Sequence, residues 1–205
     1  MPADTRPSLL SRMRDPANTR AWDEFDAQYH ELILRYCTRR GLQLPDAEDI
    51  RQAVMMNLHR GLPRFQYSRD HGRFRDYLGC TVRHAIAEFF RRQKPGAVGV
   101  GGVQEPPPPT ADDGLERVWE REWVLHHYRL ALETVRKTSD PRSVEVFGHL
   151  LEGKSVDEIT TTMNLARNAV YKTKQRMRER LRTQIALQLE EEQLPRSRGP
   201  SAVTP

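Results

Sequence analysis

Apolar residues recur at steps of three and four along much of the 205-residue chain, which is the period of an amphipathic helix. Over about 17–92 this pattern predicts three helices. Gly41 suits the end of the first helix, and the second is predicted to begin at Pro45 with Asp46 as its N-cap. The apolar stripes of the three helices are Trp22, Phe25, Tyr29, Ile33 and Tyr36; Ala47, Ile50, Val54, Leu58 and Leu62; and Leu78, Val82, Ile86 and Phe89.

A second stretch, about 116–187, is helical by the same criterion. Helices are predicted over 119–135 and 141–151, and a short helix follows Ser155, which opens a capping box with Glu158. Asn164 lies in a tight turn, where it tolerates positive φ, and a long basic helix begins at Arg167. Short helix, tight turn and long basic helix together predict a helix-turn-helix.

The segment between these stretches has no apolar period. Residues 93–114 contain five prolines and five glycines, a composition typical of a linker. The predicted fold is therefore all-α, with two small helical domains at 17–92 and 116–187, a flexible linker at 93–115 and tails at 1–16 and 188–205. No segment alternates with a period of two, so no strand is predicted.

Charge adds a functional prediction. The net charge is only +5, but residues 64–92 hold seven basic and three acidic residues, and residues 154–182 hold eight and three. Two separated basic patches predict a polyanion that is contacted at two places. No window approaches the roughly 18 apolar residues of a membrane helix, and the start does not resemble a signal peptide, so we expect a cytoplasmic protein.

Other chemistry finds little support in the sequence. Cys37 and Cys80 have no CxxC partner and lie in apolar-periodic stretches, so they are interpreted as core thiols. We predict neither a metal site nor a cofactor. Since the chain has no phosphate-binding loop, GxSxG or HExxH motif, an enzyme is not expected.

The long C-terminal helix is the strongest nucleic-acid candidate. Between residues 167 and 182 it carries seven cations and one anion, which is unfavourable in a helix without a polyanion. A solvated basic face is the alternative, but the capping box and turn favour DNA binding. Residues near the start of such a helix reach base edges, and those predicted to read sequence are Arg167, Asn168, Tyr171, Lys172 and Gln175. Those predicted to hold phosphates are Lys174, Arg176 and Arg178.

The first basic patch interleaves arginines with aromatic residues, as single-strand binding surfaces do. In the alternative interpretation, Phe65 and Phe74 anchor a core on either side of a loop and the arginines are only solvated. The candidates for binding separated strands are Arg64, Phe65, Arg69, Arg73, Arg75, Arg83, His84, Glu88 and Arg91. The acidic opening at 46–49 would repel DNA, and helix capping accounts for it.

Two short sequence motifs lie on either side of the linker. They are Asp-Ala-Glu-Asp at 46–49, before it, and Arg-Asn-Ala-Val-Tyr-Lys at 167–172, after it. Together they resemble bacterial sigma factors of the extracytoplasmic-function type, in the sigma-70 family, over about residues 20–92 (region two) and 118–185 (region four). The resemblance implies that the first basic patch captures the minus-ten element as its strands separate, and that the helix from Arg167 reads the minus-thirty-five element. It also implies docking on the clamp of the largest core polymerase subunit. The residues implied in that contact are Asp46, Asp49, Gln52, Asn57 and Arg60.

The resemblance also implies partners. These are core RNA polymerase, through its clamp and flap, promoter DNA and an anti-sigma factor, with a location at the nucleoid. Two departures stand out: Ala53 replaces a common acidic residue, and Ala166 replaces a usual Ser. A helix-turn-helix regulator without a polymerase role is one alternative, and a helical adaptor without DNA is another. A duplex regulator has no use for single-strand capture, so the patch at 64–92 discriminates against it.

Overall fold

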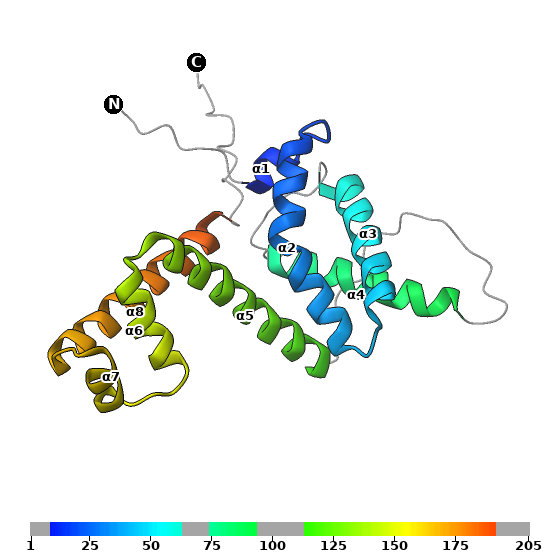
Figure 1. Cartoon of the computed structure of the whole chain (residues 1–205). Coiled ribbons are helices and arrows are strands. Elements are labelled where there is room, and N and C mark those ends of the chain that lie inside the picture. Colours follow the sequence, from blue (N-terminus) through cyan, green and yellow to red (C-terminus); the bar gives the residue numbers. More distant parts are fainter. Residues whose placement is uncertain (1–8, 63–73, 94–112, 192–205) are drawn as a thin grey trace, which may run out of the picture. The chain divides into compact units, whose positions relative to one another are not determined.

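The computed structural model describes residues 9–62, 74–93 and 113–191, which form eight helices and no strand (Figure 1). The prediction of an all-α fold is confirmed. The chain divides into two compact units, one that extends to Trp123 and one from Val124 to Glu190.

The first unit is built on α1 (Leu9–Met13), α2 (Thr19–Arg39), α3 (Leu44–Gly61) and α4 (Phe74–Arg92). Figure 1 shows α2 and α3 side by side, with α4 crossing behind them. The apolar stripes predicted for α2 and α3 are buried throughout. The Asn18 side chain caps α2 by accepting a hydrogen bond from Ala21 N at 3.1 Å, and Gly41, with φ +82°, follows its end.

Two details at helix starts differ from the sequence prediction. The prediction that Asp46 is an N-cap is wrong, because α3 begins at Leu44 with Gln43 as its N-cap and Asp46 lies in the first turn. Pro45 is tolerated there because the first turn needs no backbone donor from it. In addition, α1 lies inside the segment that was assigned to an N-terminal tail, and its Leu10 and Met13 are buried in the core.

The first half of α5 (Asp113–Thr138) packs into the first unit. Trp119 is fully buried and Trp123 is 3 % exposed. The Trp119 ring meets Tyr36 edge-on with centroids 5.2 Å apart, and the Trp123 ring lies 5.9 Å from Tyr29. Both tryptophans lie in the segment 116–187 that the apolar period predicts to be the second domain, so the structure corrects that boundary. An apolar period identifies the buried face of a helix but not the element on which that face packs.

Gly79 of α4 leaves the space that the Trp119 indole fills. A Cβ at residue 79 would lie 2.6 Å from Trp119 Nε1 and 2.8 Å from its Cε2. We expect Gly79→Ala to destabilise the first unit, since overpacking costs roughly 1–3 kcal/mol and the helix propensity of Ala returns at most about 1 kcal/mol. Urea unfolding followed by circular dichroism measures this. Gly148→Ala is the control, because its Cβ would meet nothing within 4 Å, and equal stability of the two variants would contradict the packing described.

The second unit combines the rest of α5 with α6 (Pro141–Leu151), α7 (Val156–Met163) and α8 (Arg167–Glu191). One apolar cluster joins Ala131, Val135, Phe147, Met177 and Leu181, and another joins Val146, Ile159 and Val170. A buried polar contact at 3.0 Å links α5 to α8, in which the side-chain amide of Gln188 donates to His127 Nδ1. In the part of the chain that the structure describes, no helix has the length and apolar character to cross a membrane.

Candidate polymerase and nucleic-acid interfaces

The outer face of α3 carries the residues implied in polymerase binding. Asp49, Gln52 and Arg60 are exposed on it, whereas Asp46 and Asn57 are half-buried. Met56, which the sequence analysis did not select, is 55 % exposed on the same face. Its spacing of four from Gln52 and Arg60 was the available signal. The face therefore combines an acid, an amide, a base and an unpaired apolar side chain in one row.

Arg51 holds α3 against α2 on the side away from that row. Its Nη1 lies 2.6 Å from Asp26 Oδ1 of α2, and its Nε lies 2.7 Å from Glu48 Oε2. The pair with Asp26 ties α3 to α2. Glu48 belongs to α3 itself, and its Oε1 lies 3.4 Å from His30 Nε2 of α2. Of the acidic residues in the 46–49 motif, Glu48 thus serves the packing of the two helices, while Asp49 points to solvent.

The candidates for strand capture divide into three groups. Arg64, Phe65, Arg69 and Arg73 lie outside the described residues. On α4, Arg75 and Arg83 are half-buried and paired with glutamates of α5: Arg75 Nη2 is 3.3 Å from Glu120 Oε1, and Arg83 Nη1 is 3.0 Å from Glu116 Oε2. The third group, His84, Glu88 and Arg91, lies towards the C-terminal end of α4.

The C-terminal end of α4 is polar and carries one exposed aromatic ring. Glu88 pairs with Arg91 and with Arg92, the latter at 3.0 Å. Partial desolvation opposes ionisation of Glu88, but these arginines hold the pKa of its carboxyl below the usual range. Phe90 is 44 % exposed beside them. An exposed ring next to cations can stack on an unpaired base, and sequence reasoning missed Phe90 as a member of this group.

The turn between α7 and α8 has the predicted geometry. Ser155 Oγ accepts from Glu158 N at 3.2 Å, and Ser155 N donates to Glu158 Oε2 at 2.6 Å, which confirms the capping box. These bonds with Ser155 lower the pKa of the Glu158 carboxyl. Asn164 adopts the left-handed conformation with φ 49° and ψ 54°. The α7 and α8 helices are thus held at a short, defined corner.

The face of α8 that follows this corner is exposed. Asn168, Lys172 and Gln175 recur on it at steps of three and four, with Tyr171 half exposed beside them. Arg167 extends back to Asp157 Oδ1 at 2.5 Å. The structure therefore brings together all five residues that were predicted to read sequence, on one accessible stretch of helix.

The cations predicted to hold phosphates are placed differently. Arg176 bonds Ser143 Oγ and lies 3.6 Å from Asp140 Oδ2, so it also ties α8 to the capped start of α6. Lys174 and Arg178 lie along the other edge of α8, next to a groove.

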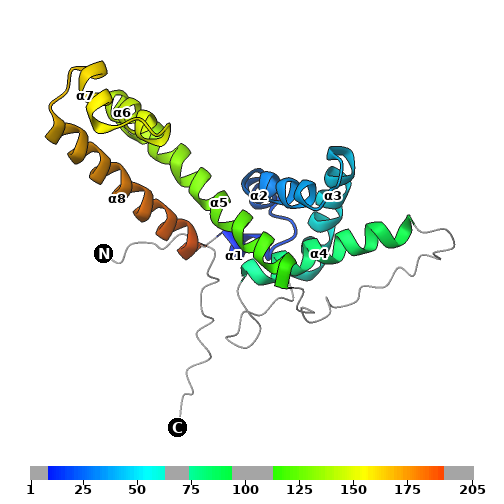
Figure 2. The same cartoon turned by 90° about the horizontal axis from the view of Figure 1, so that it is seen from below.

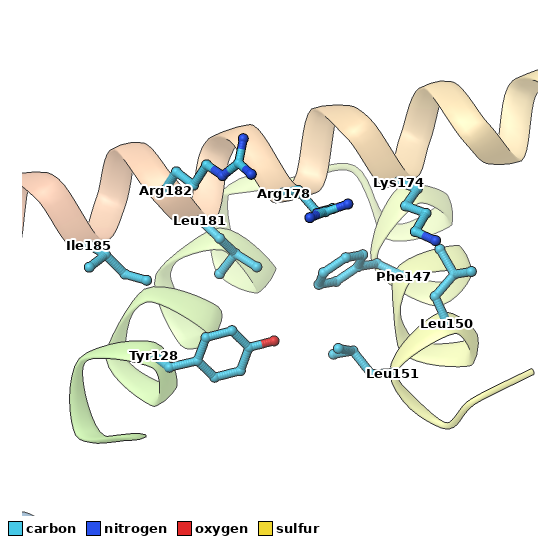
Figure 3. A pocket seen from close by; sticks show the side chains of 9 residues that line it. All are labelled: Tyr128, Phe147, Leu150, Leu151, Lys174, Arg178, Leu181, Arg182 and Ile185. Carbon is cyan, nitrogen blue, oxygen red and sulfur yellow. The ribbon is translucent and has the colours of Figure 1, made fainter. Parts of the chain in front are cut away.

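That groove lies between α5, α6 and α8 and has a volume of about 330 Å³ (Figure 3). Figure 3 shows apolar side chains from α6 and α8 and the Tyr128 ring from α5, with three cations along α8. It is lined by Tyr128, Phe147, Leu150, Leu151, Lys174, Arg178, Leu181, Arg182 and Ile185. An apolar floor with a basic edge suits an apolar segment that carries acidic residues. Sequence reasoning did not predict this groove, because its walls come from three separate helices.

Over the described residues, these features define an all-helical chain of two compact units, whose candidate sites are charged helix faces and one groove. Within the described residues, no group of three His, Cys, Asp or Glu side chains is placed to hold a metal ion.

Residues 20–95, which span α2, α3 and α4, match the family model described as Sigma-70 region 2. The match supports a sigma factor of the sigma-70 family, with a role in RNA polymerase binding and promoter melting. Sigma factors are not an enzyme family. Neither the curated proteins nor the solved structures gave a match to this chain.

Proposed function

We propose that this chain is a sigma factor of the extracytoplasmic-function type, which binds core RNA polymerase and directs promoter recognition, DNA melting and transcription initiation. The observation that carries the proposal is the match to Sigma-70 region 2 over 20–95. A regulator that binds only duplex DNA has no need of this domain, so the match favours the sigma factor. The protein would work in the cytoplasm at the nucleoid, and an anti-sigma factor is a further proposed partner.

The proposed contact with the polymerase clamp is the exposed row of α3. Asp49, Gln52 and Arg60 provide directional polar contacts, and Met56 provides apolar area at the middle of the row. Interfaces are typically strongest where an apolar centre has a polar rim. The half-buried Asp46 and Asn57 would support the ends of this contact.

The groove of the second unit is the proposed site for the polymerase flap. Its apolar floor would take apolar side chains of the flap, and Lys174, Arg178 and Arg182 would face acidic ones. This arrangement leaves the exposed face of α8 available for DNA.

The proposed melting site combines the segment 64–73 with α4. Bases that leave the stack would be held by Phe65 and by the C-terminal end of α4, where Phe90 and Arg91 are exposed. Captured bases and polymerase contacts together would offset an unstacking cost of a few kcal/mol per step. No hydrolysis is needed for that step.

The proposed contact with the minus-thirty-five element is the α7–α8 corner, with the start of α8 in the major groove. We expect Gln175→Ala to relax the preference for one base pair by about 10- to 100-fold, because a bidentate base contact contributes roughly 1–3 kcal/mol. Competition binding with single-base promoter variants measures this. Thr183→Ala is the control, because Thr183 is exposed and lies farther along α8.

Phe65→Ala should spare the binding of duplex DNA and impair promoter opening. An equal, sequence-independent loss of binding from both Gln175→Ala and Phe65→Ala would contradict the assignment of duplex reading and strand capture to different residues.

The proposed function is tested by titrating the labelled full chain with purified bacterial core RNA polymerase. We expect saturable binding with one chain per core enzyme. A chain that remains unbound at micromolar core concentration, while its circular dichroism shows it to be folded, would overturn the proposal.

A further inference from the structure

The first turns of α5 lie against one stripe of α4, formed by Arg75, Gly79 and Arg83 (Figure 2). The two helices run antiparallel in this contact, so later residues of α5 meet earlier residues of α4. Glu120 meets Arg75, Trp119 fills the space at Gly79, and Glu116 meets Arg83. We call Glu116, Trp119 and Glu120 the acidic clasp.

The Trp119 side chain fixes the register of the acidic clasp. Its Nε1 donates to the Arg75 backbone oxygen at 3.2 Å, and its ring is fully buried in the core of the first unit. Glu116 and Glu120 are four residues apart and therefore share one face of α5. With Trp119 held in place, both carboxylates are aimed at arginines of α4.

The two arginines are among the residues that the sequence predicts to bind the separated strands of the minus-ten element. A carboxylate and a phosphate are alternative partners for the same guanidinium, since both accept its N–H donors through paired oxygens. We propose that the acidic clasp is an autoinhibitory contact, in which Glu116 and Glu120 occupy Arg83 and Arg75 until the phosphates of a separated DNA strand displace them. The proposal rests on the proposed function for the identity of the polyanion.

The exposure of the four side chains makes this exchange feasible. Glu116 and Glu120 are 42 % and 50 % exposed, whereas Arg83 and Arg75 are 19 % and 26 % exposed. The carboxylates can turn into solvent while Trp119 stays in the core, so no unfolding is needed. Ion pairs at such positions are weak, so we expect each to reduce DNA affinity by only about two- to fivefold at low salt.

The test compares the full-length wild type with Glu116→Gln/Glu120→Gln in binding a labelled single-stranded 20-mer DNA. We expect the double variant to bind roughly 4- to 25-fold more tightly at low salt. The slope of log affinity against log salt should also become steeper by up to about 1.4, because each newly available phosphate contact contributes about 0.7 for single strands.

The matched control is Glu133→Gln/Glu145→Gln, which changes the net charge equally at exposed sites of the second unit. Adding Arg75→Gln/Arg83→Gln to the clasp variant should abolish its gain. Tryptophan fluorescence and circular dichroism should not differ between wild type and clasp variant. A gain no larger than that of the control would overturn the proposal, and so would absence of DNA binding by both wild type and variant.

This readout is independent of polymerase. A chain that shows the expected gain but does not bind core RNA polymerase keeps the acidic clasp and refutes the sigma factor function. Conversely, a chain that initiates transcription but shows neither gain nor slope change refutes the clasp alone.

Discussion

Replacing Trp119 with alanine is expected to lower the free energy of unfolding of the first unit by about 3–5 kcal/mol. The indole is fully buried, lies edge-on to Tyr36 with centroids 5.2 Å apart, and donates a hydrogen bond to the Arg75 backbone oxygen. Its removal leaves a cavity in the core, and the Arg75 backbone oxygen loses its hydrogen-bond donor. Urea unfolding of the full chain, followed by circular dichroism, measures the loss.

The control for Trp119→Ala lies on the same helix. Val124 is 64 % exposed, so Val124→Ala should change stability by no more than about 0.5 kcal/mol. If Trp119→Ala left the unfolding transition where Val124→Ala leaves it, α5 would not be part of the core of the first unit in solution. The acidic clasp would then lose its anchor as well.

Asp49→Lys is expected to weaken binding to core RNA polymerase by at least about tenfold. Asp49 is exposed on the outer face of α3, and reversal of a charge within an interface removes one contact and adds a repulsion. Like charges placed opposite each other across an interface cost several kcal/mol, and 1.4 kcal/mol already corresponds to about a factor of ten. Equilibrium titration of labelled full chain with core enzyme measures the change.

Asp23→Lys makes the same charge change at an exposed position near the start of α2 and serves as the control. We expect it to bind core enzyme like the wild type. Equal affinities for Asp49→Lys and wild type, or a loss as large for Asp23→Lys, would remove the α3 row as the docking face. Neither substitution touches a buried residue, so both variants should remain folded.

Much of the fold follows from local sequence patterns. The α6 helix has the bounds, 141–151, that periodicity and flanking residues predicted. Asn164 has the positive φ that its turn required. The predicted N-cap of α3 is wrong because the local signal is ambiguous. Proline fits anywhere in the first turn of a helix, so Pro45 does not show that the helix begins there, and α3 begins at Leu44.

Part of the candidate sites could also be predicted. Spacing placed Asn168, Lys172 and Gln175 on one face of α8, because a helix has a single regular period. The same rule cannot find a contact between helices. The pairing of Arg75 with Glu120 joins residues 45 positions apart, and it depends on Trp119 entering the space at Gly79. The groove beside α8 likewise becomes visible only when the packing of its three helices is known.

The measurement that tests the central claim most directly is run-off transcription with purified bacterial core RNA polymerase, the full chain and fragments of genomic DNA. We predict transcripts with defined start sites that depend on the chain and are lost with Asp49→Lys. If a folded chain yields no transcript above core enzyme alone from any fragment, the chain is not a sigma factor.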